Sequence, residues 1–288
     1  MDFRPLFRVA PGARVSLAEI NPNAAAVGFD AEDKAAVKSS LERYREEMES
    51  FQYRLYADGS KSLLVVLQAM DAAGKDGVIR HVFSAMNPQG TRVQAFKQPT
   101  PAEAARDFLW RAHLHAPARG EVVIFNRSHY EDVLVVRVHE LVPEEIWRAR
   151  YEQINQFERL LSSNGTKILK FYLHIDADEQ LARFKKRLDD PNRHWKISES
   201  DYTERKFWPD YIQAFEEAIE KTSTEESPWY IIPSNQKWFR NLAISQIITE
   251  TMREMNLTLP MVKVDLEAVR QHYHAAKSQA EKIKQSSL

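Results

Sequence analysis

A short apolar run, Leu63 to Leu67, stands directly before a loop that extends from Ala69 to Asp76, and a helical pattern follows. A run of this kind is typical of a strand that is buried on both faces of a parallel sheet. The order of strand, loop and helix directs backbone N–H groups and the positive end of a helix toward one place, where an anion can bind. This segment therefore predicts a phosphate-binding loop in a protein of the α/β class.

The loop departs at two positions from the phosphate-loop pattern G-x-x-x-x-G-K-[ST]. Gly74 and Lys75 match it, whereas Ala69 replaces the first glycine and Asp76 replaces the hydroxyl residue that ordinarily holds Mg²⁺. An acid beside phosphate repels it unless a metal lies between them, so Asp71 inside the loop is a candidate Mg²⁺ ligand. The alternative for Asp71 is a loop cap, and Asp76 is favoured in the first turn of any helix.

Further apolar runs alternate with helical patterns along the chain. This alternation predicts a parallel sheet with helices on both faces, a three-layer α/β sandwich. The expected strands are 63–67, 91–96 (the weakest), 122–125, 168–175 and 229–232, and the expected helices are 76–86, 101–114, 143–163, 177–188 and 235–254.

The two ends of the chain carry their own helices within an expected single domain of residues 1–288. Residues 1–57 predict a proline-rich extended arm, up to residue 29, and then an amphipathic helix; residues 261–285 predict a C-terminal helix. Both helices have narrow apolar stripes that suit packing on each other or on another subunit. We therefore expect a homo-oligomer, either a dimer or a tetramer.

The stretch 187–206 is basic, contains Trp195 and is interrupted by Pro191. It is either a lid that orders over bound substrate or an ordinary surface connection. Pro209, a little further on, leaves the start of the next helix undetermined, because proline is excluded from a helix interior.

A second polar segment, from Phe125 to Asp132, follows the strand 122–125. Because the carboxyl ends of parallel strands meet at one edge of a sheet, this segment and the phosphate loop are expected to face one crevice. Arg127 is then placed to reach phosphate, its alternative being a surface salt bridge. Asn126 stands where a Walker-B strand would carry aspartate, and Glu131 can supply the carboxylate instead.

Other basic residues fall on loops that should border the same crevice. Any one of them is more often a solvated surface charge, but together they would form a basic track longer than a single triphosphate needs. These residues are Lys97, Arg111, Arg119, Arg137, Arg187, Arg193, Lys196, Arg205 and Lys206.

The composition of the 288 residues excludes several classes of protein. The chain has no cysteine, which rules out disulfides, zinc–thiolate sites and cysteine nucleophiles and fits a reducing compartment. The N-terminus has no secretory h-region, and no apolar run approaches the roughly 18 residues of a membrane span, so we expect a cytoplasmic protein without a membrane partner. A net charge of −1 disfavours nucleic-acid binding.

Together these segments resemble the polyphosphate kinase 2 family, in the class III subgroup that accepts nucleoside mono- and diphosphates. The similarity extends from about residue 30 to residue 256. It rests on Leu67-Gln-Ala-Met-Asp-Ala-Ala-Gly-Lys-Asp-Gly77, Phe96-Lys-Gln-Pro99, Phe125-Asn-Arg-Ser-His-Tyr-Glu-Asp-Val-Leu134, Arg187-Leu-Asp-Asp-Pro191 with Trp195-Lys196, and Pro228-Trp-Tyr-Ile-Ile-Pro233.

The resemblance implies a thymidylate-kinase-like P-loop fold with a helical lid, inorganic polyphosphate as donor, AMP and ADP as acceptors, and Mg²⁺ as cofactor. It implies Asp71, Lys75 and Arg127 as catalytic residues and Asp71 and Glu131 as metal ligands. Asn126 and Glu131 carry the subgroup assignment and, with His129, are the expected nucleotide-binding residues. The expected phosphate and polyphosphate contacts are Ala72, Ala73, Gly74, Asp76, Gly77, Lys97, Arg111, Arg187 and Lys196.

The chemistry is consistent with such a site. An acceptor phosphate has a second pKa of about 6, so its attacking oxygen needs no strong base, whereas two polyanions need charge neutralisation to meet. Two other functions stay open on sequence alone. An ATP-dependent nucleotide kinase is disfavoured by the long basic track and the altered loop. A non-catalytic nucleotide sensor or nucleic-acid-binding module is disfavoured by the near-zero net charge.

Overall fold

The computed structural model of the protein describes residues 2–30 and 32–286. The chain divides into two compact units, Met1–Thr258 and Leu259–Leu288. The larger unit contains the sheet and the phosphate loop, and the smaller contains one long helix. That residues 1–288 act as a single domain stays a prediction.

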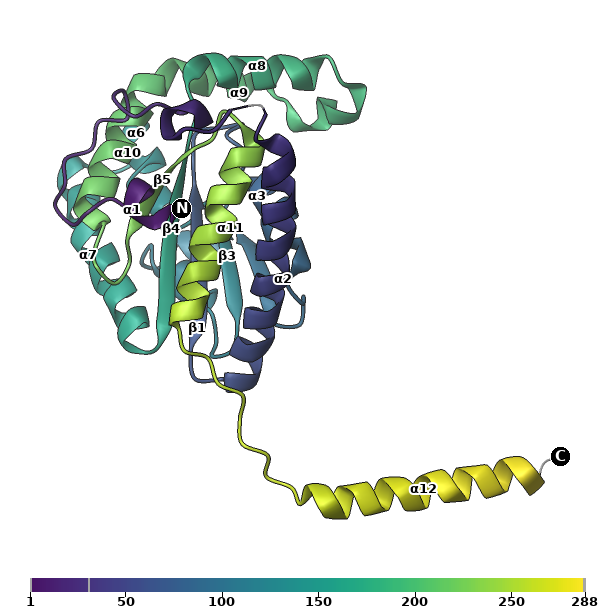
Figure 1. Cartoon of the computed structure of the whole chain (residues 1–288). Coiled ribbons are helices and arrows are strands. Elements are labelled where there is room, and N and C mark those ends of the chain that lie inside the picture. Colours follow the sequence, from purple (N-terminus) through teal and green to yellow (C-terminus); the bar gives the residue numbers. More distant parts are fainter. Residues whose placement is uncertain (1, 31, 287–288) are drawn as a thin grey trace. The chain divides into compact units, whose positions relative to one another are not determined.

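A five-stranded, fully parallel sheet lies at the centre of the larger unit, with the order β2-β3-β1-β4-β5 (Figure 1). β1 pairs with β3 on one side and with β4 on the other, and Leu67 lies opposite Asn126. The chain passes over β3 to reach β2 and over β1 to reach β4, and such a reversal leaves a crevice at the carboxyl ends of the strands. The strands are β1 (Ser62–Gln68), β2 (Thr91–Ala95), β3 (Val122–Asn126), β4 (Thr166–His174) and β5 (Trp229–Pro233).

Helices connect the strands, mostly where the sequence predicts them. The long helices are α2 (Lys34–Asp58), α3 (Lys75–Val82), α7 (Glu144–Ser163), α8 (Ala177–Leu188), α10 (Trp208–Thr222), α11 (Lys237–Glu254) and α12 (Leu266–Ser286). The short ones are α1 (Arg4–Phe7), α4 (Pro101–Ala104), α5 (Trp110–Leu114), α6 (Val135–Val138) and α9 (Glu199–Glu204), with 3-10 turns η1 (Ala24–Val27), η2 (Phe83–Ala85), η3 (His129–Asp132), η4 (Pro191–Lys196) and η5 (Arg205–Phe207).

Two predicted helices differ from the structure. The helix predicted at 76–86 ends at Val82 and continues as η2. The helix predicted at 101–114 is wrong as one element, because the Asp107 side chain accepts a hydrogen bond from the backbone N–H of Leu109 at 3.0 Å and forms a turn between α4 and α5. Pro209 lies in the first turn of α10, where its missing N–H has no intrahelical role.

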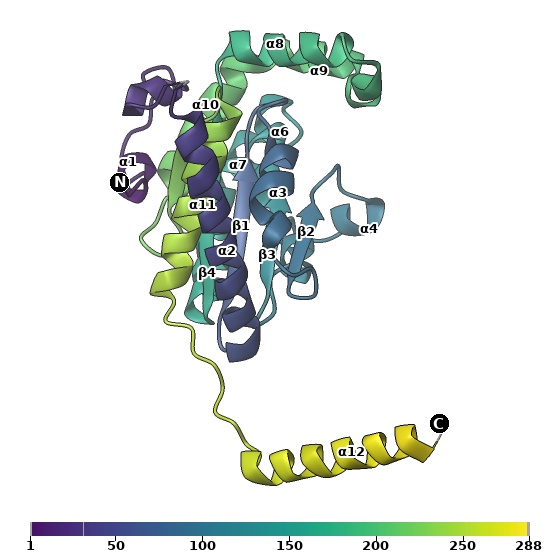
Figure 2. The ribbon, with the colours of Figure 1, turned by 45° about the vertical axis from the view of Figure 1, so that its right-hand side comes forward.

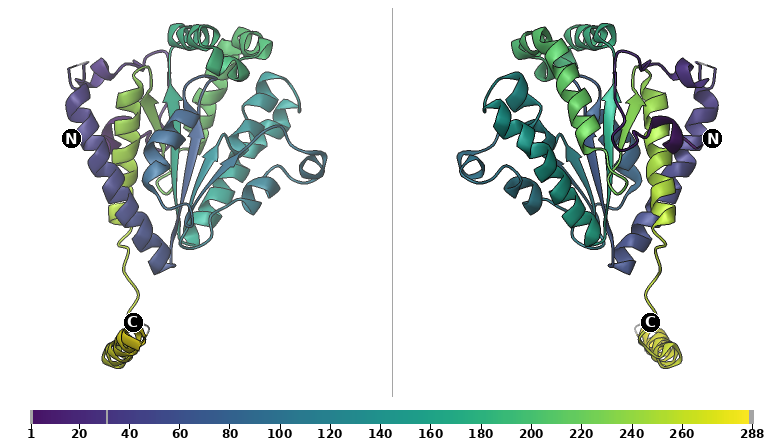
Figure 3. Two further views of the ribbon diagram at one scale, coloured as in Figure 1. Left: turned by 90° about the vertical axis from the view of Figure 1, so that its right-hand side faces the viewer. Right: turned by 90° about the vertical axis from the view of Figure 1, so that its left-hand side faces the viewer.

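The continuous apolar sequence of β1 fills two cores, because successive side chains of a strand point to opposite faces. Leu63, Val65 and Leu67 pack with residues of α2, α3 and α11. Leu64 and Val66 pack with residues of α7 and α10 on the other face. Figure 3 shows the sheet between these two helix layers, which is the predicted three-layer sandwich.

The N-terminal arm covers the outer edge of β5. It is not extended throughout, since it contains α1 and η1. The rings of Phe3 and Phe7 lie 5.6 and 6.1 Å from the ring of Phe239 in α11. The backbone N–H of Val9 donates to the carbonyl of Trp229 at 2.9 Å. The arm thereby shields an edge strand that would otherwise present unpaired backbone groups.

A buried ion pair links β4 to α7. The Nζ atom of Lys170 lies 2.5 Å from Oε2 of Glu158, 3.0 Å from the hydroxyl of Tyr130 and 2.6 Å from the carbonyl oxygen of Thr222. The ring of His129 also contacts Glu158, with Nε2 at 3.3 Å from Oε1. Lys170 and Glu158 are 0% and 1% exposed, so each charge depends on the other for compensation.

The smaller unit consists of α12 and the residues around it. Its apolar residues Leu266, Val269 and Tyr273 recur at spacings of three and four. Each is at least half exposed, at 54%, 50% and 63%. Packing of this stripe on another subunit stays a prediction. No helix among the described residues combines the length and the apolar character needed to cross a membrane.

Candidate active site

The loop after β1 adopts the conformation that the sequence leads us to expect for phosphate binding. Ala72 and Gly74 have φ angles of 62° and 110°, in the left-handed region. The first N–H groups of α3, those of Lys75, Asp76 and Gly77, have no acceptor within the helix and lie at its positive end. The side chain of Lys75 bends back, and its Nζ donates to the Ala69 carbonyl at 3.1 Å. The loop therefore combines free N–H donors, a helix dipole and one full charge.

Two buried arginines hold the other side of this loop. Nη1 of Arg183, on α8, donates to the carbonyls of Ala72 and Ala73 at 3.0 and 2.6 Å, and Nη2 donates to the carbonyl of Ser234 at 2.6 Å. Nη1 of Arg240, on α11, donates to Ala73 at 3.1 Å. These hydrogen bonds fix the carbonyls of Ala72 and Ala73. They thereby hold the loop in a conformation in which Ala72 has a left-handed φ angle.

Arg127 lies between two carboxylates. Its Nη2 is 2.8 Å from Oδ1 of Asp71, and its Nη1 is 4.0 Å from Oε2 of Glu131. Burial opposes the charge of Arg127, but the carboxylates of Glu131 and Asp71 outweigh it and raise the pKa of Arg127. The structure thus brings Asp71 of the phosphate loop together with two residues that follow β3, and the prediction that both segments face one crevice is confirmed.

The pKa values of two neighbouring groups, Glu131 and Lys75, are also shifted. Burial raises the pKa of Glu131 against the opposing charges of Arg127 and Lys75. Burial, followed by the charge of Arg127, lowers the pKa of Lys75, although Asp71 acts in the opposite direction. Glu131 and Lys75 are only partly exposed, so charges act on them more strongly than in bulk water.

The carboxylates of Asp71 and Glu131 fit a Mg²⁺ site that substrate completes. Mg²⁺ is usually bound through one or two carboxylates, with water and phosphate oxygens filling the remaining positions. Residues 2–30 and 32–286 contain no group of three or more His, Cys, Asp or Glu side chains that could hold a metal alone. The candidate Mg²⁺ ligands among these residues are therefore Asp71 and Glu131, which both pair with Arg127.

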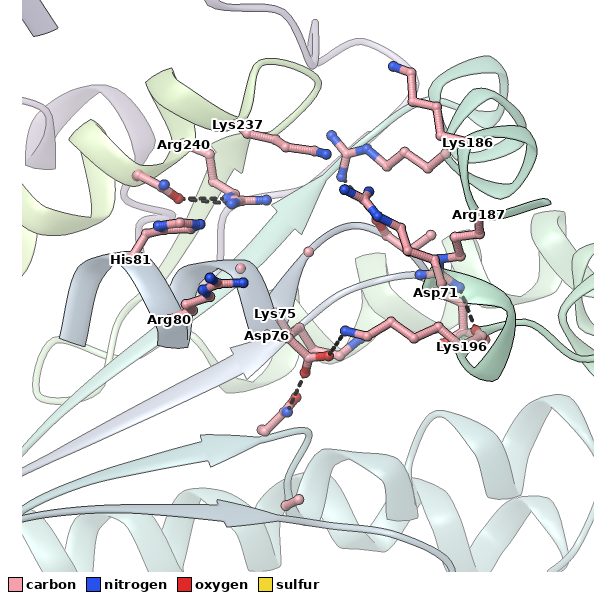
Figure 4. Close-up of a pocket in the computed structure, with 18 of the residues that line it drawn as sticks. Asp71, Lys75, Asp76, Arg80, His81, Lys186, Arg187, Lys196, Lys237 and Arg240 are labelled. Atoms are coloured by element: carbon pink, nitrogen blue, oxygen red, sulfur yellow. Dashed lines mark hydrogen bonds and ion pairs between the residues drawn. The ribbon is translucent and has the colours of Figure 1, made fainter. Parts of the chain in front are cut away.

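The crevice opens into a cavity of about 1390 Å³. Thirteen lysine and arginine side chains line it, against five of aspartate and glutamate, an excess of eight in a chain whose net charge is −1. They come from α2, α3, α8, α11, the stretch 187–206 and the loops after β2 and β3, and Figure 4 shows several converging from these elements. The sequence did not single out Lys38, Arg45, Arg80, Lys186 and Lys237, which also line it.

Residues of the stretch 187–206 border this cavity beyond the carboxyl ends of the strands (Figure 2). Nζ of Lys196 lies 3.5 Å from Oδ2 of Asp76, whose other oxygen accepts a hydrogen bond from Nδ2 of Asn126 at 3.0 Å. Nη1 of Arg187 donates to the carbonyl of Lys196 at 3.2 Å. Asp76 therefore joins the stretch 187–206 to the loop after β3.

Four predicted site residues, Ala73, Arg111, His129 and Glu131, do not line the cavity. Ala73 is fully buried, and Glu131 lines a smaller neighbouring pocket with Asp71 and Arg127. Arg111 is buried, with Nη1 donating to the carbonyl of Lys97 at 2.7 Å and Nη2 at 3.4 Å from Oδ2 of Asp132. His129 is fully buried beside Glu158. Arg111 and His129 do not border the cavity, so neither is placed to contact substrate. Lys97 itself is exposed and lines the cavity.

Sequence reasoning also missed two further cavity residues, Arg183 and Arg240. Arg240 follows β5, so the rule applied to β1 and β3 could have found it. Arg183 lies in the run Leu181-Ala-Arg-Phe-Lys-Lys-Arg187, where a basic residue on a helix gives no sign of burial.

The strand order, the glycine–lysine loop and the crevice at the strand ends define a P-loop kinase-like α/β protein. The family model "Polyphosphate kinase 2 (PPK2)" matches residues 31–260, and the chain belongs to this family.

Three relatives illustrate the similarity. The AMP/ADP-polyphosphate phosphotransferase of Meiothermus ruber is 48% identical over 263 residues, 91% of this chain and 98% of the relative. The ADP-polyphosphate phosphotransferase of Rhodopseudomonas palustris is 43% identical over 266 residues, 88% and 91% of the two chains. The crystal structure of polyphosphate kinase 2 from Arthrobacter aurescens TC1 matches with a TM-score of 0.91 and 40% identity, over 96% of this chain and 97% of that chain.

Proposed function

We propose that the protein transfers phosphoryl groups from inorganic polyphosphate to AMP and ADP, giving ADP and ATP, with the help of Mg²⁺. The observation that carries this proposal is the excess of eight basic side chains around the cavity. At about 1390 Å³ the cavity also exceeds the roughly 300–1,000 Å³ of an ordinary small-molecule site. A chain of phosphates together with a nucleotide accounts for both the size and the charge. The names of the relatives support the same reaction.

In this reaction an oxygen of the acceptor's terminal phosphate forms a bond to the end phosphorus of polyphosphate. The P–O bond to the next phosphate breaks, and the chain leaves one unit shorter. The N–H groups at the start of α3 and the ammonium of Lys75 hold the phosphoryl group in transfer, and Arg127 neutralises charge between donor and acceptor. Mg²⁺, held by Asp71 and Glu131, would supply further charge neutralisation.

We expect both AMP and ADP to be acceptors. The proposal rests on Asn126 and Glu131, because the resemblance associates these residues with the subgroup that uses both nucleotides. Purified protein incubated with polyphosphate, Mg²⁺ and AMP should form ADP first and ATP later, as followed by anion-exchange chromatography. Conversion of ADP without any conversion of AMP would show that the subgroup assignment is wrong.

The phosphoryl donor separates this proposal from the alternatives. Parallel reactions with ATP in place of polyphosphate should give much slower phosphorylation of AMP. Faster reaction with ATP would show that the protein is an ATP-dependent nucleotide kinase. Absence of turnover with either donor would favour a non-catalytic nucleotide sensor.

We further propose that the enzyme works in the cytoplasm as a homo-oligomer, without nucleic acid or membrane as a partner. The absence of cysteine and the exposed apolar stripe of α12 support this. Light scattering during size-exclusion chromatography measures the number of subunits.

We expect the stretch 187–206 to act as a lid that orders over bound substrates and excludes water from the transfer. Arg187→Gln and Lys196→Gln should each lower turnover roughly tenfold or more, because both side chains line the cavity, with little change in melting temperature. Lys185→Gln is the matched control, because the Lys185 side chain is 74% exposed and lies on α8 with Arg187.

Hydrogen exchange supplies an independent test of the lid. Backbone amides of residues 187–206 should gain protection when AMP and polyphosphate are added together. Equal protection in the free and bound protein, with all three variants fully active, would reduce this stretch to a surface connection.

A further inference from the structure

Arg240 is a buried cation without a carboxylate partner. It is 1% exposed, and its guanidinium donates to neutral acceptors, to Oδ1 of Asn241 at 3.2 and 2.9 Å and to the carbonyl of Ala73 at 3.1 Å. Within the described residues it forms neither a hydrogen bond nor an ion pair with an acidic side chain. A buried charge in such surroundings is costly, because hydrogen bonds to neutral groups replace only part of the lost hydration.

The surroundings of Arg240 are positive rather than neutral. Arg183 donates to the same carbonyl, that of Ala73. A Cβ atom added at Gly74 would lie 2.1 Å from Nη1 of Arg240, and one at Gly77 would lie 3.0 Å from Nη2. The guanidinium is therefore packed against the first turn of α3, at the positive end of the helix dipole.

The effects on ionisation agree with this arrangement. Burial lowers the pKa of Arg240 to about 9, and the nearby charge of Arg183 adds to the shift. Burial, then Arg183 and Arg240, lowers the pKa of Lys237 one turn earlier on α11. Figure 4 shows Lys237 and Arg240 projecting from α11 toward the same cavity. This cluster of positive charge lies next to the phosphate loop and borders the cavity.

We propose that Arg240 is a phosphate-positioning residue whose counter-ion is the phosphate chain of the substrate. The inference rests on the proposed function, which makes the substrate a polyanion. In the free protein the cation is under-compensated. A phosphate group at the start of α3 compensates Arg240 and the helix dipole at once, so part of the binding free energy comes from relief of this repulsion.

Arg183 provides the contrast. Its guanidinium donates to the backbone carbonyls of four residues, Ala72, Ala73, Ser234 and Asn235, and its Nε lies 2.7 Å from Oε1 of Glu179. Its donors and its charge are thus satisfied within the protein. We expect Arg183 to stabilise the fold, whereas Arg240 stabilises the complex.

The two roles predict opposite effects on the free protein. Arg183→Met should lower the stability to urea, because it leaves buried carbonyls without donors. Arg240→Met should leave the stability equal to that of the wild type or raise it, because an apolar side chain of similar length replaces an uncompensated charge. Arg240→Lys keeps a charge and serves as the conservative variant.

Binding of tripolyphosphate, measured by calorimetry, and the KM for polyphosphate are the readouts that a structural role alone would not move. Arg240→Met should weaken binding at least tenfold, raise the KM for polyphosphate in proportion, and lose most of the rise in melting temperature that tripolyphosphate causes. Arg240→Lys should recover part of the affinity.

Two results would overturn the inference in distinguishable ways. If Arg240→Met unfolds more easily than the wild type and Arg240→Lys binds tripolyphosphate with unchanged affinity, Arg240 is a structural residue and the proposed function stands. If the wild-type protein itself does not bind tripolyphosphate, the proposed function and this inference both fail.

Discussion

Lys75→Ala and Asp71→Asn are each expected to lower turnover by a factor of roughly 10²–10³ or more, the usual effect of losing a preorganised charge at the reacting group. Lys75 is the full positive charge of the phosphate loop, and Asp71 is the loop carboxylate that contacts Arg127 at 2.8 Å. Initial rates with polyphosphate and AMP measure the loss. The fold should be unaffected, because the Lys75 side chain makes a single hydrogen bond, to the Ala69 carbonyl, within the described residues, and Asn is nearly isosteric with Asp.

The exposed pair Lys185–Asp189 provides matched controls for these two variants. Its side chains are 74% and 59% exposed, and neither lines the cavity. Lys185→Ala and Asp189→Asn should keep wild-type rates. If Lys75→Ala and Asp71→Asn have unchanged circular dichroism and rates within a few-fold of wild type, the loop is a structural turn and not the transfer site.

Glu158→Ala should reduce the free energy of unfolding by about 3–5 kcal/mol, as should Lys170→Met, because each leaves the opposite charge buried without compensation. The two groups lie 2.5 Å apart and are almost fully buried. Urea titration followed by fluorescence measures the loss. Burial opposes the charge of Glu158, but Lys170 and His129 together outweigh it and lower the pKa of Glu158.

The lowered pKa of Glu158 determines how the stability of the protein changes with pH. A carboxyl whose pKa is lower in the folded protein contributes stability above its unfolded pKa, and the contribution is lost as the pH falls through the folded pKa. The wild type should therefore lose more stability than Glu158→Ala on acidification below the ordinary pKa of glutamate, 4.5.

A double variant tests whether the cost arises from unpaired charge. Glu158→Leu combined with Lys170→Met removes both charges and should cost less than the sum of the two single changes. Lys185→Met, which breaks the exposed pair, should cost about 0–1 kcal/mol. Strictly additive single and double variants would mean that the two charges do not compensate one another.

The strands could be predicted because apolar runs mark burial on both faces. β2 gave the weakest pattern, since it lies at the edge of the sheet and Val93 remains 45% exposed. The helix at 101–114 was predicted wrongly because one hydrogen bond from the Asp107 side chain decides its interruption, and apolar periodicity does not report such a bond. Strands buried on both faces can thus be predicted from apolar runs, whereas a helix end set by one side-chain hydrogen bond is harder to predict.

In the site, the convergence of Asp71, Asn126 and Arg127 followed from the meeting of parallel strand ends at one edge. That rule does not say to which side of the sheet a side chain turns, and His129 turns toward Glu158 of α7 instead. Arg183 could not be found in this way, because its burial depends on segments more than 50 residues away on either side, as its bonds at separations of 111 and 51 residues show.

The placement of the N-terminal arm determines when the larger unit can assemble during synthesis. The backbone N–H of Phe3 bonds to the side chain of Gln246, 243 residues further along, and α2 packs beside α11 (Figures 1 and 2). The apolar sides of the arm and of α2 stay uncovered on the ribosome until α11 has been made. Contacts of such separation form slowly, and a nascent chain that waits with exposed apolar surface is prone to associate with others. A translation product that stops before α11 is therefore an aggregation hazard, even though it already contains the phosphate loop.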